Sequence, residues 1–128
     1  MVIDYTSKIM PLLLSNKVVT GWTFKLNGKV PNISANKTPS GQLPAIVLYE
    51  SLNRDGEFAD DRPYTSRLKY QISLFSENGG FSTVPDEIDD LMRTLGFTRD
   101  NLFTQFDKDT KIYQKIMLYS AEPSFDTI

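Results

Sequence analysis

Hydrophobic and polar positions alternate most regularly between Tyr64 and Phe75, which predicts a strand with one buried and one solvated face. A second strand is predicted from Leu43 to Leu52, because this run is apolar almost throughout, as a central strand would be. The connection between them is polar and contains Gly56, so an antiparallel hairpin with a long tip is expected. In the alternating strand the apolar members face one way and the polar members the other: Leu68, Tyr70, Ile72 and Leu74 against Arg67, Lys69, Gln71 and Ser73.

Helical spacing is clearest after Gly79 and Gly80. Thr83 is the expected N-cap, with Asp86 three residues on in an arrangement like a capping box, and Gly96 is the expected end. The predicted apolar stripe consists of Val84, Ile88, Leu91 and Leu95.

A first helix is expected within Asp4 to Ser15, on the spacing of Ile9, Leu12 and Leu13. Pro11 lies inside this pattern. A helix that starts at Asp4 should therefore end or bend there, whereas one that starts near Met10 would carry the proline in its first turn.

Two further segments complete the N-terminal half. Lys17 to Leu26 is rich in Val, Thr, Trp and Phe, which favours a strand, and Asn27-Gly28 is a turn signal. From Gly28 to Gln42 the sequence is polar and predicts a long loop.

The C-terminal part predicts two more strands, Leu102 to Phe106 and Thr110 to Ser120, around a turn at Asp107 to Asp109. The order is then helix, strands, helix, strands. It predicts one domain, residues 1–128, of the α+β class: a mainly antiparallel β-sheet with two helices packed on one face.

Composition removes several kinds of chemistry. The 128 residues include neither cysteine nor histidine, which excludes disulfides, thiol nucleophiles, imidazole bases and the usual zinc ligands. No calcium-binding loop motif, nucleophile motif or phosphate-binding glycine loop is found, so we expect no metal, no cofactor and no enzymatic activity. The apolar run Ile9 to Leu14 is too short for a membrane span and lacks a basic leader, so an intracellular soluble protein is expected.

Two acidic clusters admit a functional interpretation. Asp86, Glu87, Asp89 and Asp90 could be acid–base carboxylates, but a solvated helix start stabilised by the helix dipole is favoured. A cation site from Asp55, Glu57, Asp60 and Asp61 is less favoured than a hairpin tip of mixed charge.

Basic and aromatic residues also interleave, at Arg67 to Tyr70 and at Lys111 to Lys115, as in some single-strand nucleic-acid binders. Because Tyr70 is expected on the buried face and the net charge is −2, nucleic-acid binding is a minor alternative.

Four segments, in this order and spacing, resemble the tail completion and tail terminator (head–tail joining) proteins of long-tailed bacteriophages, the siphophages. The resemblance covers nearly the whole chain and departs most from Asn27 to Gln42. Its pieces are Leu43 to Glu50, Tyr64 to Phe75, Met92 to Phe97, and Asp109 to Lys115.

This resemblance implies a structural virion protein that forms a ring, a hexamer, at the head-proximal end of the tail. It would end tail tube polymerisation and join the tail to the head connector, with partners that are itself, the tail tube protein and the connector proteins. It would be present in the host cytoplasm during assembly, bind no membrane and no specific nucleic acid, and let DNA pass through the ring. Alternatives of the same fold are a non-enzymatic intracellular adaptor and a single-stranded nucleic-acid-binding module.

Ring or connector contacts are expected from the two long polar segments, the hairpin tip and the Gly28 to Gln42 loop, because a cyclic ring needs two different patches on each copy. The interface residues expected at the tip are Asn53, Arg54, Asp55, Glu57, Phe58, Asp60, Asp61 and Arg62.

Overall fold

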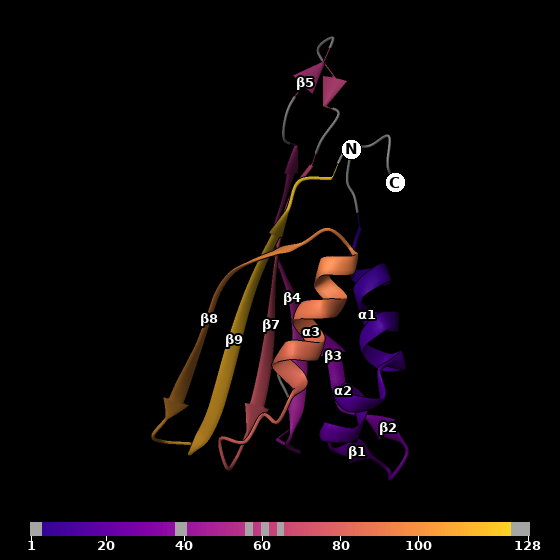
Figure 1. The fold of residues 1–128 in the computed structure, drawn as a ribbon. Coiled ribbons are helices and arrows are strands. Elements are labelled where there is room, and N and C mark those ends of the chain that lie inside the picture. Colours follow the sequence, from indigo (N-terminus) through magenta and orange to yellow (C-terminus); the bar gives the residue numbers. More distant parts are fainter. Residues whose placement is uncertain (1–3, 38–40, 56–57, 60–61, 64–65, 124–128) are drawn as a thin grey trace.

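The computed structural model describes residues 4–37, 41–55, 58–59, 62–63 and 66–123. A five-stranded sheet in the order β3-β4-β7-β9-β8 carries the helices on one face (Figure 1), which confirms the predicted α+β class. The elements are α1 (Thr6–Ser15), α2 (Lys17–Trp22), β1 (Lys25–Leu26), β2 (Val30–Pro31), β3 (Ile33–Ala35), β4 (Ala45–Asp55), β5 (Phe58–Ala59), β6 (Arg62–Pro63), β7 (Ser66–Ser76), α3 (Val84–Thr94), β8 (Thr98–Asp107) and β9 (Ile112–Ala121).

The predicted antiparallel hairpin is confirmed as β4 and β7, paired from Ala45↔Phe75 to Asp55↔Ser66. The apolar face of β7 is buried as predicted, with each of its four members at most 1% exposed. The opposite face is not uniformly solvated, because Ser73 is also fully buried. The side-chain amides of Gln71 and Gln114 donate to the Ser73 hydroxyl, at 2.8 and 3.1 Å, and satisfy it there.

One core joins the sheet to the helices. Ile9 and Leu13 of α1 pack with Val84 and Ile88 of α3 over the apolar side of β4, β7 and β9. In α3 the predicted stripe was partly wrong: Leu91 and Leu95 are half-buried at the edge of the core, and Met92, which is 1% exposed, is buried instead.

The predicted strand from Lys17 to Leu26 was wrong for most of its length. Residues Lys17–Trp22 form α2, a third helix, and only Lys25–Leu26 are extended. The Asn16 side chain caps α2 by accepting the backbone N–H groups of Val18 and Val19, both at 3.0 Å. That cap and the complete burial of Val19 outweigh the modest strand preference of β-branched residues.

Pro11 lies in the middle of α1, which continues to Ser15. The helix therefore neither ends at the proline nor starts close to it. Burial of Ile9 before it and Leu13 after it holds one face of α1 against the core on both sides.

The segment from Gly28 to Gln42, predicted as a loop, contains two short strands. β2 pairs with β1 around the predicted Asn27-Gly28 turn, whose two residues both have positive φ, as a type I′ turn requires. β3 is an edge strand that pairs with β4 in parallel, with Ser34 opposite Val47. Three-residue strands give too little periodicity to be found in sequence.

The end of α3 agrees with the prediction and its start agrees in part. Gly96 has φ +88°, and the N–H groups of Gly96 and Phe97 donate to the carbonyls of Arg93 and Met92, at 2.9 and 3.0 Å. These two bonds form a Schellman motif. At the other end Thr83 is the N-cap residue, but its side chain makes no capping hydrogen bond.

β8 is the outer strand of the sheet next to β9. It is longer than predicted, and most of its side chains are exposed. Its pairing with β9 is interrupted by a register shift between Arg99 and Asn101. Beyond that shift, the run from Leu102 to Phe106 contains no charged residue.

Candidate assembly surfaces

The β4–β7 hairpin carries the predicted interface residues away from the body of the molecule. In Figure 1 its far end, marked by β5, projects well beyond the helices. The backbone of β4, β5 and β6 includes Asn53, Arg54, Asp55, Phe58 and Arg62, whereas Glu57, Asp60 and Asp61 lie outside the described residues. The assignment of this tip as an interface stays a prediction.

The base of the hairpin is attached to α1 through one buried hydroxyl. Tyr70 on β7 donates to the Glu50 carboxylate at 3.1 Å and accepts from the backbone N–H of Tyr5 at 3.3 Å. The hydroxyl of Thr6 lies 3.4 Å from the same oxygen. Burial raises the pKa of the Tyr70 hydroxyl to about 12, and the Glu50 charge adds to the rise. The start of α1 and the start of the projecting arm therefore share one polar contact.

A second polar cluster joins α3 to β8 and β9. The Tyr119 hydroxyl donates to Asp89, and the Arg99 guanidinium lies 2.5 Å from the other carboxylate oxygen of Asp89. Burial, followed by the bond to Asp89, raises the pKa of Tyr119 far above its ordinary value. Of these three residues, Asp89 belonged to an acidic cluster weighed from the sequence, and Tyr119 and Arg99 belonged to no predicted site.

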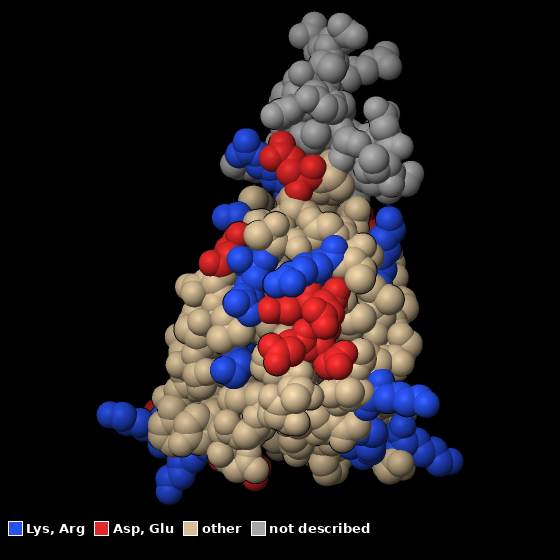
Figure 2. All heavy atoms as spheres, viewed as in Figure 1, with Lys and Arg blue, Asp and Glu red and all other residues tan. Residues whose placement is uncertain are grey.

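Asp89 corrects the interpretation of the acidic cluster on α3. Asp86 and Asp90 are exposed and Glu87 is half-buried, but Asp89 is only 8% exposed. A helix turns 100° per residue, so one of four acidic neighbours points inward, toward Tyr119 and Arg99. Figure 2 shows the acidic side chains gathered on this face, with basic side chains beside them.

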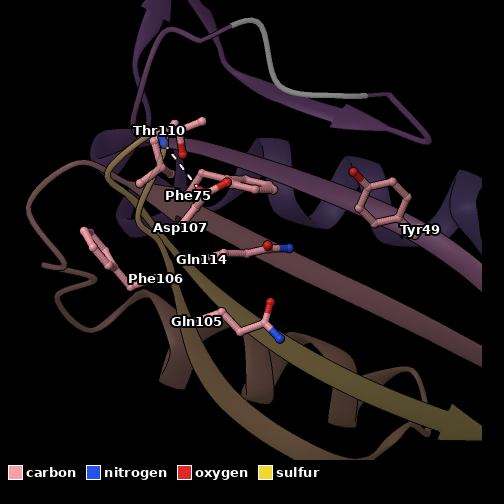
Figure 3. A pocket seen from close by; sticks show the side chains of 8 residues that line it. Tyr49, Phe75, Gln105, Phe106, Asp107, Thr110 and Gln114 are labelled. Carbon is pink, nitrogen blue, oxygen red and sulfur yellow. Dashed lines mark hydrogen bonds between the residues drawn. The ribbon is translucent and has the colours of Figure 1, made fainter.

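The sheet face away from the helices has a shallow hollow of about 820 Å³. Figure 3 shows Tyr49, Phe75, Gln105 and Gln114 around it, contributed by β4, β7, β8 and β9. The charged member of its lining is Asp107, at the turn between β8 and β9. This carboxylate accepts the backbone N–H groups of Asp109 and Thr110, and both bonds lower its pKa. The rest of the lining consists of amide, hydroxyl, aliphatic and aromatic side chains.

Within the described residues, no group of three or more carboxylates is placed to hold a metal ion. The less favoured cation site falls on the hairpin tip, whose side chains are outside the description. No helix in the described part of the chain is long and apolar enough to cross a bilayer.

The two aromatic residues weighed for nucleic-acid binding differ in exposure. Tyr70 is fully buried, as predicted. Tyr113 is half-buried, with its ring 4.6 Å from that of Phe106. Tyr70 is therefore not available to stack on a base.

Comparison with known proteins gives a fold and no family. No family model and no curated protein matches the chain. One solved structure with a similar chain is described as the virion of a native gene transfer agent (GTA) particle. The similarity has a TM-score of 0.58 and covers 91% of each chain at 11% sequence identity. The two chains share a fold.

Proposed function

We propose that this chain is a structural, non-enzymatic virion protein of a phage-like particle. The observation that supports this most is the fold shared with a chain of the GTA virion over 91% of both chains. The segments that resemble tail completion proteins lie in or beside β4, β7, the end of α3 and the turn leading into β9. The absence of cysteine and histidine from the sequence agrees with a role in assembly.

Within this class, we propose a hexameric ring at the head-proximal end of the tail, which ends tube polymerisation and binds the head connector. A ring with heterologous contacts needs a surface on one copy that reaches a different surface on the next. The projecting β4–β7 hairpin supplies such an arm. Tail tube and connector proteins are the proposed partners, with DNA passing through the ring.

Phage complementation tests this function. A phage that lacks the gene should accumulate unjoined heads and tails, or tails of uncontrolled length, and the wild-type chain should restore infectious particles. The variants Arg54→Glu and Asp60→Lys with Asp61→Lys should fail to complement, because like charges brought together across an interface are strongly disfavoured, and circular dichroism should show that they fold normally. Asp90→Lys, an exposed change on α3, is the matched control and should complement.

Two outcomes would count against the proposal. Normal joining of heads and tails without the protein would refute the virion role. Normal yield from both tip variants would remove the hairpin tip as the working surface and leave the outer strand faces in its place.

A further inference from the structure

The sheet face away from the helices carries mainly apolar side chains, and we call it the outer sheet face. Residues opposite each other on neighbouring strands share a face, so Phe75 of β7 lies on this face with Ala45 of β4 and Gln114 of β9. The hollow lies here too, with Phe75 and Gln114 in its lining. By the same register, the large apolar side chains of the outer sheet face are Val47, Phe75, Phe103, Ile112, Ile116 and Leu118.

Strand β9 is mostly apolar on both faces. Met117 faces the helices and is fully buried in the core. The residues of β9 on the outer sheet face are Ile112, Gln114, Ile116 and Leu118. A strand with one solvated face normally alternates apolar and polar residues, whereas a strand that is apolar on both sides is normally covered on both. Helices cover one side of the sheet (Figure 1), so this pattern indicates that a partner covers the other.

The most exposed apolar side chains lie in two places. Among the described residues, five large hydrophobic side chains are prominently exposed, and one of them, Phe106, lines the hollow. The other four come from α1, α2, the residue before β1, and β2, elements that Figure 1 places at the end away from β5. We call these four residues the apolar end: Leu14, Val18, Phe24 and Val30.

Two residues of the apolar end form a continuous patch. The register of the β1–β2 hairpin places Leu26 opposite Val30, and the Asn32 N–H donates to the Phe24 carbonyl at 2.8 Å, so Phe24 lies opposite Asn32. Side chains two residues apart on one strand share a face, so Phe24 and Val30 are diagonal neighbours. They are 38% and 55% exposed. Grouped exposed apolar side chains mark contact surfaces more often than single ones do.

The charges beside the two surfaces are opposite in sign. Between Asp4 and Glu50 the sequence contains five lysines and no acidic residue, and Lys17 and Lys29 are exposed beside the apolar end. Figure 2 shows basic side chains projecting at the lower right, where Figure 1 places α2, β1 and β2. In the hollow, the charged member of the lining is the exposed carboxylate of Asp107. Opposite charges at the rim of an apolar contact favour one partner and one orientation.

We propose that the apolar end of one copy of this chain binds the hollow on the outer sheet face of a second copy. The apolar end lies beside α1 and α2, and the hollow lies on the face of the sheet that those helices do not cover, so one chain cannot bring the two together. Each copy then offers two different patches, as a heterologous contact that closes into a ring requires. This contact rests on the proposed function and names surfaces through which ring neighbours meet, apart from the hairpin.

Because the chain has no cysteine, paired cysteines can test the contact directly. Val30→Cys on β2 with Gln105→Cys in the lining of the hollow should give, on mild oxidation of the purified protein, a ladder of covalently joined copies. Each single variant should give dimers at most. The matched control combines Val30→Cys with Thr104→Cys. The Thr104 hydroxyl accepts from Lys115, and successive side chains of a strand point to opposite faces, so this pair should give no ladder.

Two results of the cross-linking experiment would overturn the proposal. One is the absence of a ladder from the pair at positions 30 and 105. The other is an equal ladder from the control pair, which would show that the joined copies met by random collision.

Opposite charges at position 30 test the orientation of the contact. Val30→Asp and Val30→Lys both remove the apolar side chain, but the first brings a carboxylate toward Asp107 and the second an ammonium group. Light scattering over a concentration series should show the wild-type mass rising from the monomer to a plateau. The concentration at half-assembly should be about tenfold higher for Val30→Asp than for Val30→Lys.

The substitution Asp107→Asn is the control for this charge effect, because it removes the charge and keeps a side-chain oxygen for the backbone N–H groups of the turn. In that background the two variants at position 30 should assemble alike. Thermal midpoints should match the wild type, since Val30 is exposed. A wild-type mass that stays at the monomer value, or equal effects of Val30→Asp and Val30→Lys when Asp107 is present, would refute the contact.

The two proposals fail separately. Wild-type complementation in the phage experiment together with no ladder from the pair at positions 30 and 105 would refute this contact and leave the virion role standing. A ladder together with failed wild-type complementation would refute the virion role and leave the contact between copies.

Discussion

Tyr119 on β9 donates a hydrogen bond to the buried carboxylate of Asp89 on α3, thirty residues earlier in the chain. Arg99 on β8 binds the other oxygen of that carboxylate, so one side chain connects a helix to two strands. Removing either partner of a buried charge destabilises the folded state, because the free-energy cost of desolvating the charge is then no longer compensated. The cluster should therefore contribute to stability as a unit.

Asp89→Ala should lower the free energy of unfolding by about 3 kcal/mol, because it leaves the Tyr119 hydroxyl buried without its acceptor. Urea denaturation followed by circular dichroism measures this. Asp90→Ala removes an exposed carboxylate from the next position and should change stability by under about 0.5 kcal/mol. Equal effects of the two substitutions would show that Asp89 is not held by the cluster.

Core burial predicts a graded response to truncation. Ile72→Ala and Met92→Ala should each cost about 2–5 kcal/mol, since Ile72 is fully buried and Met92 is 1% exposed. Leu91→Ala should cost less, because Leu91 is only half-buried at the edge of the core. Thermal midpoints of the three variants should rank accordingly. If Leu91→Ala lowered the thermal midpoint as much as Met92→Ala does, the assignment of Met92 to the buried side of α3 and of Leu91 to its edge would be contradicted.

Stability should fall in alkali. The pKa of Tyr70 is raised from 10.0 to about 12, so the folded state holds the phenol proton more tightly than the unfolded state does. The corresponding stabilisation is complete below about pH 10 and is lost as the pH rises through the folded pKa. Urea midpoints measured between about pH 8 and pH 12 should show this decline.

Lysines also titrate in this range, so a tyrosine variant is the control. Tyr70→Phe should start from lower stability, because Glu50 and the Tyr5 N–H lose a partner. Its stability should then decline less steeply above pH 10 than that of the wild type. Parallel curves for the two proteins would assign the alkaline decline to other groups.

Gly96 and Gly21 should respond oppositely to alanine. Apart from the adjacent backbone, no atom lies within 4 Å of a Cβ built at either position, so space does not distinguish them. Gly96 has φ +88°, and alanine there should cost about 1–2 kcal/mol. Gly21 lies within α2 without a positive φ, and alanine there should stabilise by about 0.5–1 kcal/mol. Differential scanning calorimetry of both variants tests the difference.

Sequence patterns correctly predicted β7 and the end of α3, where local sequence alone determines the structure. The alternation of Leu68 to Leu74 requires one buried face in any sheet, and Gly96 ends α3 through a conformation that glycine adopts most easily. The strand prediction for Lys17–Trp22 was wrong because the Asn16 cap, a local signal that was overlooked, and the burial of Val19, which depends on the fold, favour a helix. The prediction that Asp89 is solvated was also wrong. Its partners Tyr119 and Arg99 are distant in sequence and come together with it only in the folded chain.

The candidate assembly surfaces were likewise predicted only in part. The antiparallel hairpin was predicted, because an apolar strand and an alternating strand around a polar segment have few other ways to pair. The exposed apolar side chains of Leu14, Val18, Phe24 and Val30 were not predicted, because they are spread over several short elements.

The outer strand β8 affects how the purified protein should be handled. Its uncharged run from Leu102 to Phe106 leaves an unguarded edge, onto which any extended segment can add. Chains that add to one another through this edge form an open-ended assembly, whose mass would rise steadily with protein concentration. A closed ring would instead keep a fixed mass. A dilution series in light scattering separates the two behaviours. A lysine in place of Thr104 should suppress the open-ended growth and leave the proposed ring unaffected.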